Sequence, residues 1–510
     1  MTKFQKPSAT VKANTAAYET TAVIDPNGFR EYDARWQVFD QINLNGFFYL
    51  GLGLGTQIKR HHKNVASPKV VVGHDYRSYS LSIKQAVMNG LMASGCTVLD
   101  IGLCLSPTVY FAQTHLDAQG LAMVTASHND NGWSGVKMGL EPRLTHGPVQ
   151  MAELKEIVLN ADFDPAPSGK GGSYQQAFDV RAAYVKHLTH GVKLSKPYKV
   201  VLATGNGTAG LFAEDVFKAV GCDVVPLHTE MDYTYPHFNP NPENVAFMEA
   251  LADKVREENA DLGLGFDGDG DRTGVADATG TFLYNDKLAL ILARFLAKHH
   301  ANATFVVDVK STGLFMVDDV LQQTGAKVIY WKTGHSHIKR KVAEEKALAG
   351  FEKSGHFFFN QPASAATPKG DLYDDGLAGG LMLLRAMDSQ QKSVQELMAE
   401  LPATYQAPTY HPACPDEQKY GVVDHVVAHF EKAFKAGQKV GGQDIKDLIT
   451  VNGVRLVLAD GTWGLVRASS NVPSLVVTGE SPASAASLHA VMADLQTTLK
   501  TEAGIAEFIK

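Results

Sequence analysis

The stretch KVVVGHD, residues 69–75, is followed by LSIKQAVMNGLMASG, residues 81–95, and these two segments decide the fold class. The first is a short apolar run that ends in polar residues, which predicts a buried strand followed by a loop. The second has apolar residues at helical spacing and a closing glycine, which predicts a helix that stops at Gly95. Together they indicate one strand–loop–helix unit of an α/β protein.

The same alternation continues along most of the chain. Further apolar runs followed directly by loop residues are TVLDIG (97–102), LAMVTAS (121–127), YKVVLATGNG (198–207), CDVVPLH (222–228), DLGLGFDGDGD (261–271), ATFVVDVKST (303–312) and AKVIYWKTG (326–334). Repeated units of this kind predict mixed, largely parallel sheets. In such sheets ligands bind beyond the carboxyl ends of the strands, so the loops after these runs are the first place to look for function.

The chain has 510 residues, which is too long for one compact core. The pattern breaks at DFDPAPSGKGGS (162–173), near residues 282–286, and in LPATYQAPTYHPACP (401–415). We therefore expect four domains. The first three, at residues 1–165, 174–283 and 284–402, share the strand–helix rhythm. The last, at 408–510, is shorter and indicates an α+β domain.

Composition excludes several classes of protein. The net charge of −7 does not favour nucleic acid or an anionic membrane as a partner. The four cysteines are scattered and form no CxxC pair, which argues against a disulfide framework or a zinc site. The N-terminal segment has no apolar core of a signal peptide, and no apolar run is long enough to span a bilayer. We expect a cytoplasmic protein.

The strongest chemical signal is FDGDGDR, residues 266–272. Asp267, Asp269 and Asp271 alternate with glycines that allow a sharp turn, and carboxylates this close repel one another unless a cation neutralises them. Hard oxygen ligands favour Mg²⁺, Mn²⁺ or Ca²⁺. An EF-hand would need Gly and Glu where the chain has Arg272 and Ala278. The segment predicts a magnesium site open to phosphate. The alternative is a solvated acidic turn.

The second signal is TASHND, residues 125–130, at the end of an apolar run. Ser127 is a candidate nucleophile with His128 as its base, a candidate phosphate carrier, or a cap of the next segment. An acyl-transfer triad has weak support because the segment is not a GxSxG elbow. Lys137 adds a cation that could neutralise a phosphoryl group.

Two later segments carry polar clusters. In FEKSGH (351–356), Glu352, Ser354 and His356 alternate, so in an extended loop they would share one face suited to sugar hydroxyls; the alternative is a surface turn. In LVRASSNVPSLVV (465–477), a guanidinium and several hydroxyl and amide groups suit a phosphate dianion; the alternative is an ordinary turn between strands. The residues of this second cluster are Arg467, Ser469, Ser470 and Asn471. Weaker candidates are Arg30, Lys310 and His335.

Taken together, the segments TASHN, DGDGDR, TGHSHIK, EKSGH and RASSN resemble, in order and near spacing, those of the α-D-phosphohexomutase superfamily. Within it the chain is most similar to the bacterial phosphomannomutase/phosphoglucomutase branch. The resemblance implies a heart-shaped α/β protein of four domains. Three would be similar α/β units, and the C-terminal one would be an α+β domain like the TATA-binding protein.

The resemblance also implies roles for the candidate residues. Ser127 would be the phosphoserine, and with its phosphate Asp267, Asp269 and Asp271 would hold Mg²⁺. Glu352 and Ser354 would bind sugar hydroxyls. The non-transferred phosphate would be held by Arg467, Ser469, Ser470 and Asn471. The remaining cleft residues would be Arg30, Lys137, Arg272, Lys310, His335 and His356, with Lys137 or His356 as the general base.

The chain departs from the family pattern at Asp130, where proline is usual, at Phe351, where glycine is usual, and at Val472, where a hydroxyl is usual. Lys353 resembles the mannose and glucose branch, whereas glutamine is more typical of phosphoglucosamine mutases. The first two departures barely touch the mechanism. The third leaves open which donors hold the distal phosphate.

The implied activity is the interconversion of hexose 1-phosphates and 6-phosphates of mannose or glucose, an intramolecular phosphotransfer classed as an isomerase reaction. It would pass through phospho-Ser127 and a 1,6-bisphosphate, with glucose 1,6-bisphosphate as activator. We expect a monomer or weak homodimer whose partner is a small phosphosugar. Alternatives are a phosphoglucosamine mutase and a magnesium-dependent phosphosugar phosphatase or binding protein.

Overall fold

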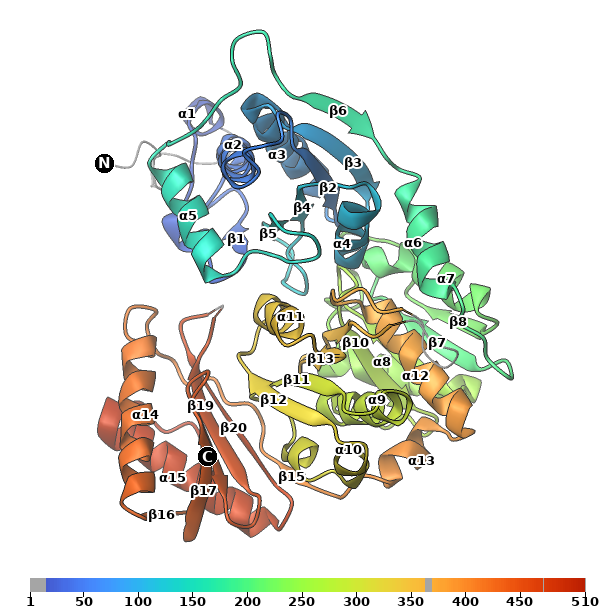
Figure 1. The fold of residues 1–510 in the computed structure, drawn as a ribbon, viewed down its shortest axis with the longest axis vertical. Coiled ribbons are helices and arrows are strands. Elements are labelled where there is room, and N and C mark those ends of the chain that lie inside the picture. Colours follow the sequence, from blue (N-terminus) through green and yellow to red (C-terminus); the bar gives the residue numbers. More distant parts are fainter. Residues whose placement is uncertain (1–14, 363–368, 471, 510) are drawn as a thin grey trace. The chain divides into compact units, whose positions relative to one another are not determined.

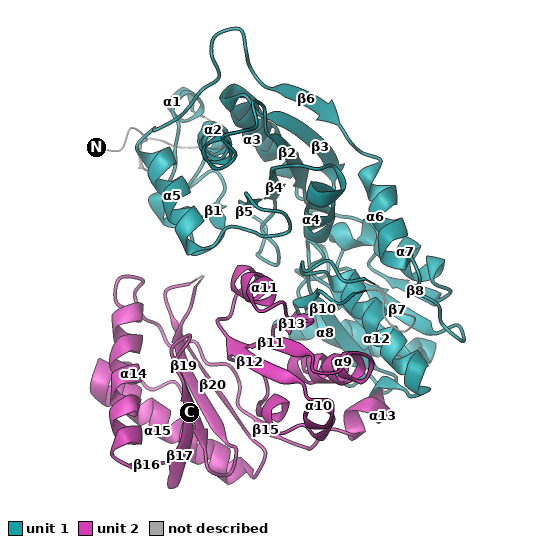
Figure 2. Cartoon of the chain, viewed as in Figure 1, with its two compact units in different colours: residues 1–283, 354–394 teal, residues 284–353, 395–510 magenta. Residues whose placement is uncertain are grey.

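A computed structural model describes residues 15–362, 369–470 and 472–509 of the chain (Figure 1). The chain divides into two compact units (Figure 2). Unit 1 contains residues 1–283 and 354–394, and unit 2 contains residues 284–353 and 395–510. None of the helices in the described part of the chain is long and apolar enough to cross a membrane.

The first sheet of unit 1 has six strands in the order β1-β5-β4-β2-β3-β6. The neighbours β4, β2, β3 and β6 are parallel to one another. At one edge, β5 pairs antiparallel with β4 on one side and with β1 on the other. These strands are β1 (Ala34–Gln37), β2 (Lys69–His74), β3 (Thr97–Leu103), β4 (Gly120–Val124), β5 (Trp133–Gly139) and β6 (Ser173–Gln176). The central strands are buried, as their apolar runs predicted.

Helices pack on this sheet and complete its core. They are α1 (Ala16–Thr20), α2 (Leu44–His61), α3 (Ser80–Ser94), α4 (Ser106–His115) and α5 (Pro148–Leu159), with a short 3₁₀ turn η1 at Pro26–Gly28. The helix predicted over 81–95 is confirmed as α3. It ends at Gly95, whose φ of +98° is a left-handed cap that favours glycine. The strand–loop–helix reading of the opening stretch therefore holds in β2 and α3.

The second sheet of unit 1 has the order β10-β9-β7-β8, in which β7, β8 and β9 are parallel and β10 is antiparallel to β9. Its strands are β7 (Lys199–Ala203), β8 (Asp223–Leu227), β9 (Leu262–Phe266) and β10 (Thr273–Asp277). The other elements of this part are η2 (Thr208–Leu211), α6 (Val180–Thr189), α7 (Ala213–Ala219), α8 (Val245–Glu258), β14 (Phe357–Phe359) and α12 (Gly376–Gln390). Strands β9 and β10 form a hairpin, and its connection is the segment DGDGDR.

Unit 2 contains a parallel arrangement in which β11 (Thr304–Asp308) lies between β12 (Lys327–Trp331) and β13 (Ala349–Phe351). Its helical elements are α9 (Asn285–His299), η3 (Gly313–Met316), α10 (Asp319–Gln323) and α11 (His335–Glu344). The chain passes from unit 1 back into unit 2 through α13 (Val394–Ala399). Polar residues follow all three strands at their carboxyl ends, as the sequence predicted.

The C-terminal part of unit 2 is an antiparallel sheet in the order β15-β20-β19-β18-β17-β16. Its elements are β15 (Tyr405–Gln406), α14 (Lys419–Lys435), β16 (Lys439–Val440), β17 (Gln443–Ile449), β18 (Val454–Leu458), β19 (Trp463–Ala468), β20 (Leu475–Ser481) and α15 (Ala485–Ala503). Both helices pack on the same sheet face, where β18 contributes Leu456 and β19 contributes Val466. The expected α+β domain is confirmed. Because side chains alternate along a strand, Arg455, Trp463 and Arg467 lie on the opposite face.

Candidate active site

Ser127 lies in the turn that follows β4, at the carboxyl end of a strand. Its φ of +54° is left-handed, a conformation that costs a non-glycine residue about 1–2 kcal/mol. Its backbone N–H donates to Thr125 Oγ1 at 2.8 Å. The next regular element is strand β5, which starts at Trp133, so Ser127 is not the cap of a helix. The two remaining possibilities are a nucleophile and a phosphate carrier.

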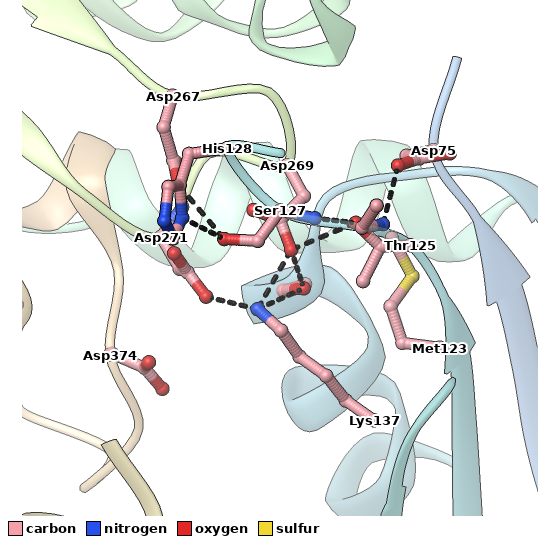
Figure 3. Close-up of polar contacts among 12 residues, drawn as sticks. Asp75, Met123, Thr125, Ser127, His128, Lys137, Asp267, Asp269, Asp271 and Asp374 are labelled. Atoms are coloured by element: carbon pink, nitrogen blue, oxygen red, sulfur yellow. Dashed lines mark hydrogen bonds and ion pairs between the residues drawn. The ribbon is translucent and has the colours of Figure 1, made fainter. Parts of the chain in front are cut away.

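The acidic loop between β9 and β10 faces this turn (Figure 3). Asp267, Asp269 and Asp271 are fully buried, and each offers a carboxylate oxygen within 4.8 Å of the others. Gly270 has a φ of +74°, which allows the sharp turn. The backbone N–H groups of Asp271 and Arg272 donate to Asp267 Oδ1 at 3.1 and 3.2 Å and orient that carboxylate. The loop therefore gathers the three carboxylates.

The serine turn and the acidic loop are in direct contact. Ser127 Oγ donates to Asp267 Oδ2 at 3.3 Å. A Cβ atom on Gly268 would lie only 2.7 Å from the Ser127 carbonyl oxygen, so this close approach requires glycine. Two hydroxyls donate to Asp269 Oδ2, from Ser106 at 2.6 Å and from Thr125 at 3.2 Å. The serine hydroxyl is thus held against a carboxylate rather than an oxyanion hole.

Lys137, on β5, supplies a positive charge to the cluster. Its Nζ donates to Asp269 Oδ2 at 2.7 Å and to Asp271 Oδ2 at 2.5 Å. Burial alone lowers the pKa of Lys137, but these carboxylates outweigh it and hold the pKa well above the usual value. Burial and the carboxylates of Asp271 and Asp269 raise the pKa of Asp267 well above its usual range. The ammonium contacts two of the three carboxylates, and Asp267 has only the more distant Arg272 Nε, at 3.7 Å. A divalent cation that prefers oxygen ligands is suited to such a cluster.

His128 is a second neighbour of the serine hydroxyl. Its Nδ1 lies 3.2 Å from Ser127 Oγ. Burial, helped by the positive charge of Arg272, holds the pKa of His128 well below the usual histidine value. A neutral imidazole can exchange a proton with the hydroxyl. Because Asp267 faces the same hydroxyl, the surroundings suit a phosphate bridged by a cation better than an acyl group.

A second proton-transfer group lies beside the acidic loop. The Nε–H of Arg272 donates to His356 Nε2 at 3.0 Å, and His356 Nδ1 lies 3.0 Å from Asp374 Oδ2 and 3.6 Å from Asp271 Oδ1. Burial lowers the pKa of His356, but Asp271 and Asp374 outweigh it, so the pKa lies above the usual histidine value. With Nε2 accepting from Arg272, the ring proton lies on Nδ1, toward Asp374.

Asp374 and Ser106 were not predicted as site residues from the sequence. Asp374 is fully buried and comes just before Asp375, which caps α12. The acidic pair before a helix was a visible signal for a cap, but nothing in the sequence linked it to His356. Ser106 begins α4 and carried no signal of its contact with Asp269.

In unit 2, Asp308 organises the carboxyl ends of the three parallel strands. Its oxygens accept from Ser311 Oγ at 2.6 Å, from Thr333 Oγ1 at 3.1 Å and from the backbone N–H of Lys353 at 3.3 Å. Lys310 Nζ lies 3.8 Å from Asp308 Oδ2. The same edge carries two further predicted residues, the buried His335 at the start of α11 and the buried Glu352 after β13.

Other predicted residues lie in turns. Arg30 is in the turn before β1, where its N–H donates to Asp33 O at 2.9 Å. Residues 353–355 form a turn with a φ of +95° at Gly355. Of the two possibilities left open by the sequence, an extended loop and a turn, the chain adopts a turn between Glu352 and His356.

The predicted phosphate-binding segment connects β19 and β20. Arg467 is buried at the end of β19, and its guanidinium donates to Ala468 O at 2.8 Å. Ser469 Oγ accepts from the backbone N–H of Val472 at 3.3 Å, which closes the turn that contains Ser470. Asn471 lies outside the described residues.

Comparison with known proteins agrees with this geometry. Three family profiles match the chain, described as phosphoglucomutase/phosphomannomutase alpha/beta/alpha domains I, II and III, at residues 26–165, 182–280 and 284–405. A phosphomannomutase/phosphoglucomutase of Pseudomonas aeruginosa is 32% identical over 88% of this chain and 90% of its own length. A phosphoglucomutase of Neisseria gonorrhoeae is 30% identical over 90% and 94%.

A solved structure is similar over nearly the whole chain. It is a phosphoglucomutase/phosphomannomutase family protein from Burkholderia thailandensis, with a TM-score of 0.82 and 28% identity. The match covers 95% of this chain and 99% of that one. The similarity therefore extends to the C-terminal sheet, which lies beyond the three matched profiles.

Proposed function

Because the chain belongs to the phosphoglucomutase/phosphomannomutase family, we propose that it is a phosphohexomutase acting on mannose and glucose phosphates. It interconverts hexose 1-phosphates and hexose 6-phosphates by intramolecular phosphotransfer. The observation that carries the proposal is the placement of Ser127 Oγ against Asp267, in a cluster that also contains Lys137. A serine beside a buried acidic cluster and an ammonium is suited to carrying a phosphoryl group.

The acidic loop fits a bound Mg²⁺. Three carboxylates that are fully buried cannot all stay ionised without a cation, and burial and mutual repulsion already raise the pKa of Asp267. Among the described residues, Asp269 Oδ1 is buried and has no hydrogen-bond partner. Asp267, Asp269 and Asp271, with the phosphate on Ser127, would hold the ion. When bound it supplies positive charge to the transferring phosphoryl group.

In the reaction, one phosphoryl group passes from Ser127 to the sugar, and the other phosphoryl group of the sugar later passes to Ser127. The bond from phosphorus to Ser127 Oγ breaks, a bond to the free sugar hydroxyl forms, and the result is a hexose 1,6-bisphosphate. The hydroxyl proton passes to a base, and Ser127 Oγ is protonated in turn. After the sugar reorients, the other phosphate returns to Ser127. Glucose 1,6-bisphosphate enters the same cycle midway and so serves as activator.

The geometry supports His356 as the base. Lys137 Nζ is engaged by two carboxylates, which favours a charged ammonium that neutralises phosphate rather than a proton acceptor. His356 Nε2 accepts from Arg272 and Nδ1 lies beside Asp374, so the neutral ring takes the hydroxyl proton at Nε2 once Arg272 turns from the ring to the phosphoryl group. Arg272 then remains close by to stabilise charge on the phosphoryl group. His128 keeps its own contact with the serine hydroxyl and is the second candidate.

We extend the proposal to the sugar and phosphate contacts, on the resemblance of the segments EKSGH and RASSN to those of the family. Glu352 and Ser354 bind sugar hydroxyls, and Arg467 anchors the phosphate that is not transferred. The further substrate-binding residues are Arg30, Lys310, His335, Ser469, Ser470 and Asn471. A buried guanidinium with hydroxyl donors on the same turn is suited to a phosphate dianion.

A substrate comparison tests the proposal. Purified protein with Mg²⁺ and a trace of glucose 1,6-bisphosphate is assayed with mannose 1-phosphate, glucose 1-phosphate and glucosamine 1-phosphate, with Ser127→Ala as control. We expect 6-phosphates from the first two and none from the variant. Turnover of glucosamine 1-phosphate alone would assign a phosphoglucosamine mutase. Release of inorganic phosphate without isomerisation would replace the mutase with a phosphatase.

A further inference from the structure

Arg77 lies in the loop between β2 and α3, and its guanidinium donates hydrogen bonds to the backbone of the turn that contains Ser127. Its side chain has no exposed surface. A guanidinium has five N–H donors, and here each faces an acceptor. The acceptors are Asp75 Oδ2 at 3.2 Å, Ser127 O at 3.1 Å, Asn129 O at 2.7 Å, Asp130 O at 3.1 Å and Asn131 Oδ1 at 3.5 Å. The ring of Tyr235 covers the guanidinium at 5.4 Å.

Asp75 binds the same turn through the backbone of Ala126 (Figure 3). Its Oδ2 accepts from the backbone N–H of Ala126 at 3.3 Å as well as from Arg77 Nε. Its Oδ1 accepts from Ser80 Oγ at 2.5 Å, which ties the carboxylate to the first turn of α3. Asp75 therefore holds the residue before Ser127, while Arg77 holds the carbonyl of Ser127 itself.

The position of these hydrogen bonds matters because Ser127 is in a left-handed conformation. A serine with a φ of +54° relaxes to a negative φ unless its neighbours prevent it. Relaxation would rotate Oγ away from Asp267, which lies 3.3 Å from it. The hydrogen bonds from Asp75 and Arg77 fall on both sides of the strained residue and are suited to holding it.

Arg77 is not placed to bind substrate. All five of its donors are engaged by the protein, and the side chain is inaccessible to solvent. A phosphate-binding arginine would instead present free N–H groups to the ligand. Arg77 therefore acts through Ser127 and not on the sugar.

We propose that Asp75 and Arg77 are a positioning pair that holds Ser127 in the left-handed conformation needed for phosphoryl transfer. The inference rests on the proposed function of Ser127 as phosphate carrier. The pair touches neither the sugar nor the transferred phosphate. Its loss should lower kcat while leaving KM nearly unchanged, since a displaced phosphate carrier slows transfer in both directions.

The test uses Arg77→Lys, Asp75→Asn and the control Arg294→Lys. Lysine keeps the charge beside Asp75 but has three donors and a different reach, so it cannot hold the same carbonyls. Arg294 pairs with Asp318 at 2.7 Å and is also largely buried, so its variant measures the general effect of altering a buried arginine. We expect kcat to fall by about a hundredfold in Arg77→Lys and about tenfold in Asp75→Asn. KM should stay within about threefold, and Arg294→Lys should keep the wild-type kcat.

A half-reaction isolates the step itself. Protein freed of phosphate is mixed with glucose 1,6-bisphosphate, and the rate at which Ser127 gains a phosphoryl group is followed by intact-protein mass spectrometry. The rate should fall in both variants by the same factors as kcat. Addition of guanidinium ion to Arg77→Ala should restore part of the rate. Thermal melting of every variant gives the folded fraction by which the rates are corrected.

Three results would contradict the proposal that Asp75 and Arg77 position Ser127. Wild-type rates per folded molecule in Arg77→Lys and Asp75→Asn would reduce the pair to a structural contact. A raised KM with unchanged kcat would make Arg77 a substrate ligand. If Arg77→Lys does not fold, an unchanged half-reaction rate in the isosteric Asp75→Asn is sufficient to reject the idea. Failure of wild-type protein to gain phosphate would instead contradict the proposed function.

Discussion

Two buried carboxylate clusters, one in each unit, are built in opposite ways. In unit 2, both oxygens of Glu480 are surrounded by donors. They are Lys287 Nζ at 2.6 Å, Thr404 Oγ1 at 2.7 Å, the Gly313 N–H at 2.8 Å, Thr312 Oγ1 at 2.9 Å and Trp463 Nε1 at 3.0 Å. In unit 1, Asp269 and Asp271 share the ammonium of Lys137, and Asp267 has only a longer contact with Arg272 Nε, at 3.7 Å.

The pKa values follow this difference. Burial raises the pKa of Glu480, but Lys287 and the other donors outweigh it and hold the pKa well below the usual range. Burial raises the pKa of Asp267 as well, and there the neighbouring carboxylates add to the effect. A carboxylate with every oxygen satisfied stabilises the fold, whereas a cluster with surplus charge is suited to binding a cation.

Arg455 extends the satisfied cluster. Its guanidinium lies between the rings of Tyr330 and Trp463, at 4.2 and 3.8 Å, and donates to the carbonyls of Val309 and Ser311 at 2.7 Å each. These carbonyls flank Lys310, so the network also fixes the backbone of a predicted substrate-binding residue. The Glu480 network in unit 2 therefore stabilises the fold and also holds the backbone on both sides of Lys310.

The largest expected effect comes from Asp267→Asn. Asparagine keeps the acceptor for the backbone N–H groups of Asp271 and Arg272 but removes one charge from the acidic loop. We expect mutase kcat to fall about a thousandfold because charge stabilisation of the transferring group is lost. Melting in a chelator should be unchanged or higher, since a repelled carboxylate is gone. A large loss of stability would show that the Asp267 carboxylate stabilises the fold as Glu480 does, which would contradict the difference between the two clusters.

The next effect is expected from Glu480→Gln, which leaves Lys287 buried without its countercharge. We expect a loss of about 3–5 kcal/mol in the free energy of unfolding, with kcat per folded molecule retained. A depressed pKa contributes stability above the pKa of the unfolded chain and loses it as pH falls. The difference from wild type should therefore shrink in acid. Glu345→Gln, which alters a more exposed ion pair with Lys341, should change stability far less than Glu480→Gln.

Asp375, in unit 1, is intermediate between Glu480 and Asp267. It accepts from Ala378 N at 3.0 Å and Tyr184 Oη at 2.8 Å but forms no ion pair among the described residues, and burial raises its pKa to about 6. A raised pKa means stability that is present in acid and lost as pH rises. The difference between this pKa and the ordinary aspartate value of 3.8 corresponds to about 3 kcal/mol in the free energy of unfolding.

Asp375→Asn removes this titration and keeps the helix cap. Above about pH 6 the variant should therefore be more stable than wild type by up to about 3 kcal/mol, and near pH 4 the two should converge. Denaturant unfolding at a series of pH values measures this. An Asp375→Asn variant that is less stable than wild type at pH 8 would show that the carboxylate is ionised and favourable.

The sequence predicted what is contiguous and missed what is assembled over long separations. DGDGDR places three carboxylates within five residues, so its chemistry can be read directly. His356 and Asp374 meet through a turn and a strand, and Glu480 meets Lys287 across 193 residues. Neither pairing has a local signal. The strand and helix of the opening stretch were predictable because apolar spacing is local.

Backbone conformation at the site was also beyond the sequence. Serine rarely adopts a left-handed φ, so nothing in TASHND predicted the strain at Ser127. The sequence likewise left open whether residues 352–356 form an extended loop or a turn, since glycine at position 355 permits both conformations. The four proposed domain ranges remain predictions.

The central claim is that Ser127 carries phosphate. The most direct measurement is intact-protein and peptide mass spectrometry after phosphate-free protein is mixed with glucose 1,6-bisphosphate and Mg²⁺. We expect one added phosphoryl group, located on Ser127, that is lost again when glucose 1-phosphate is supplied and is never gained by Ser127→Ala. Isomerisation that proceeds with Ser127 unmodified, or with the phosphoryl group on His128, would contradict it.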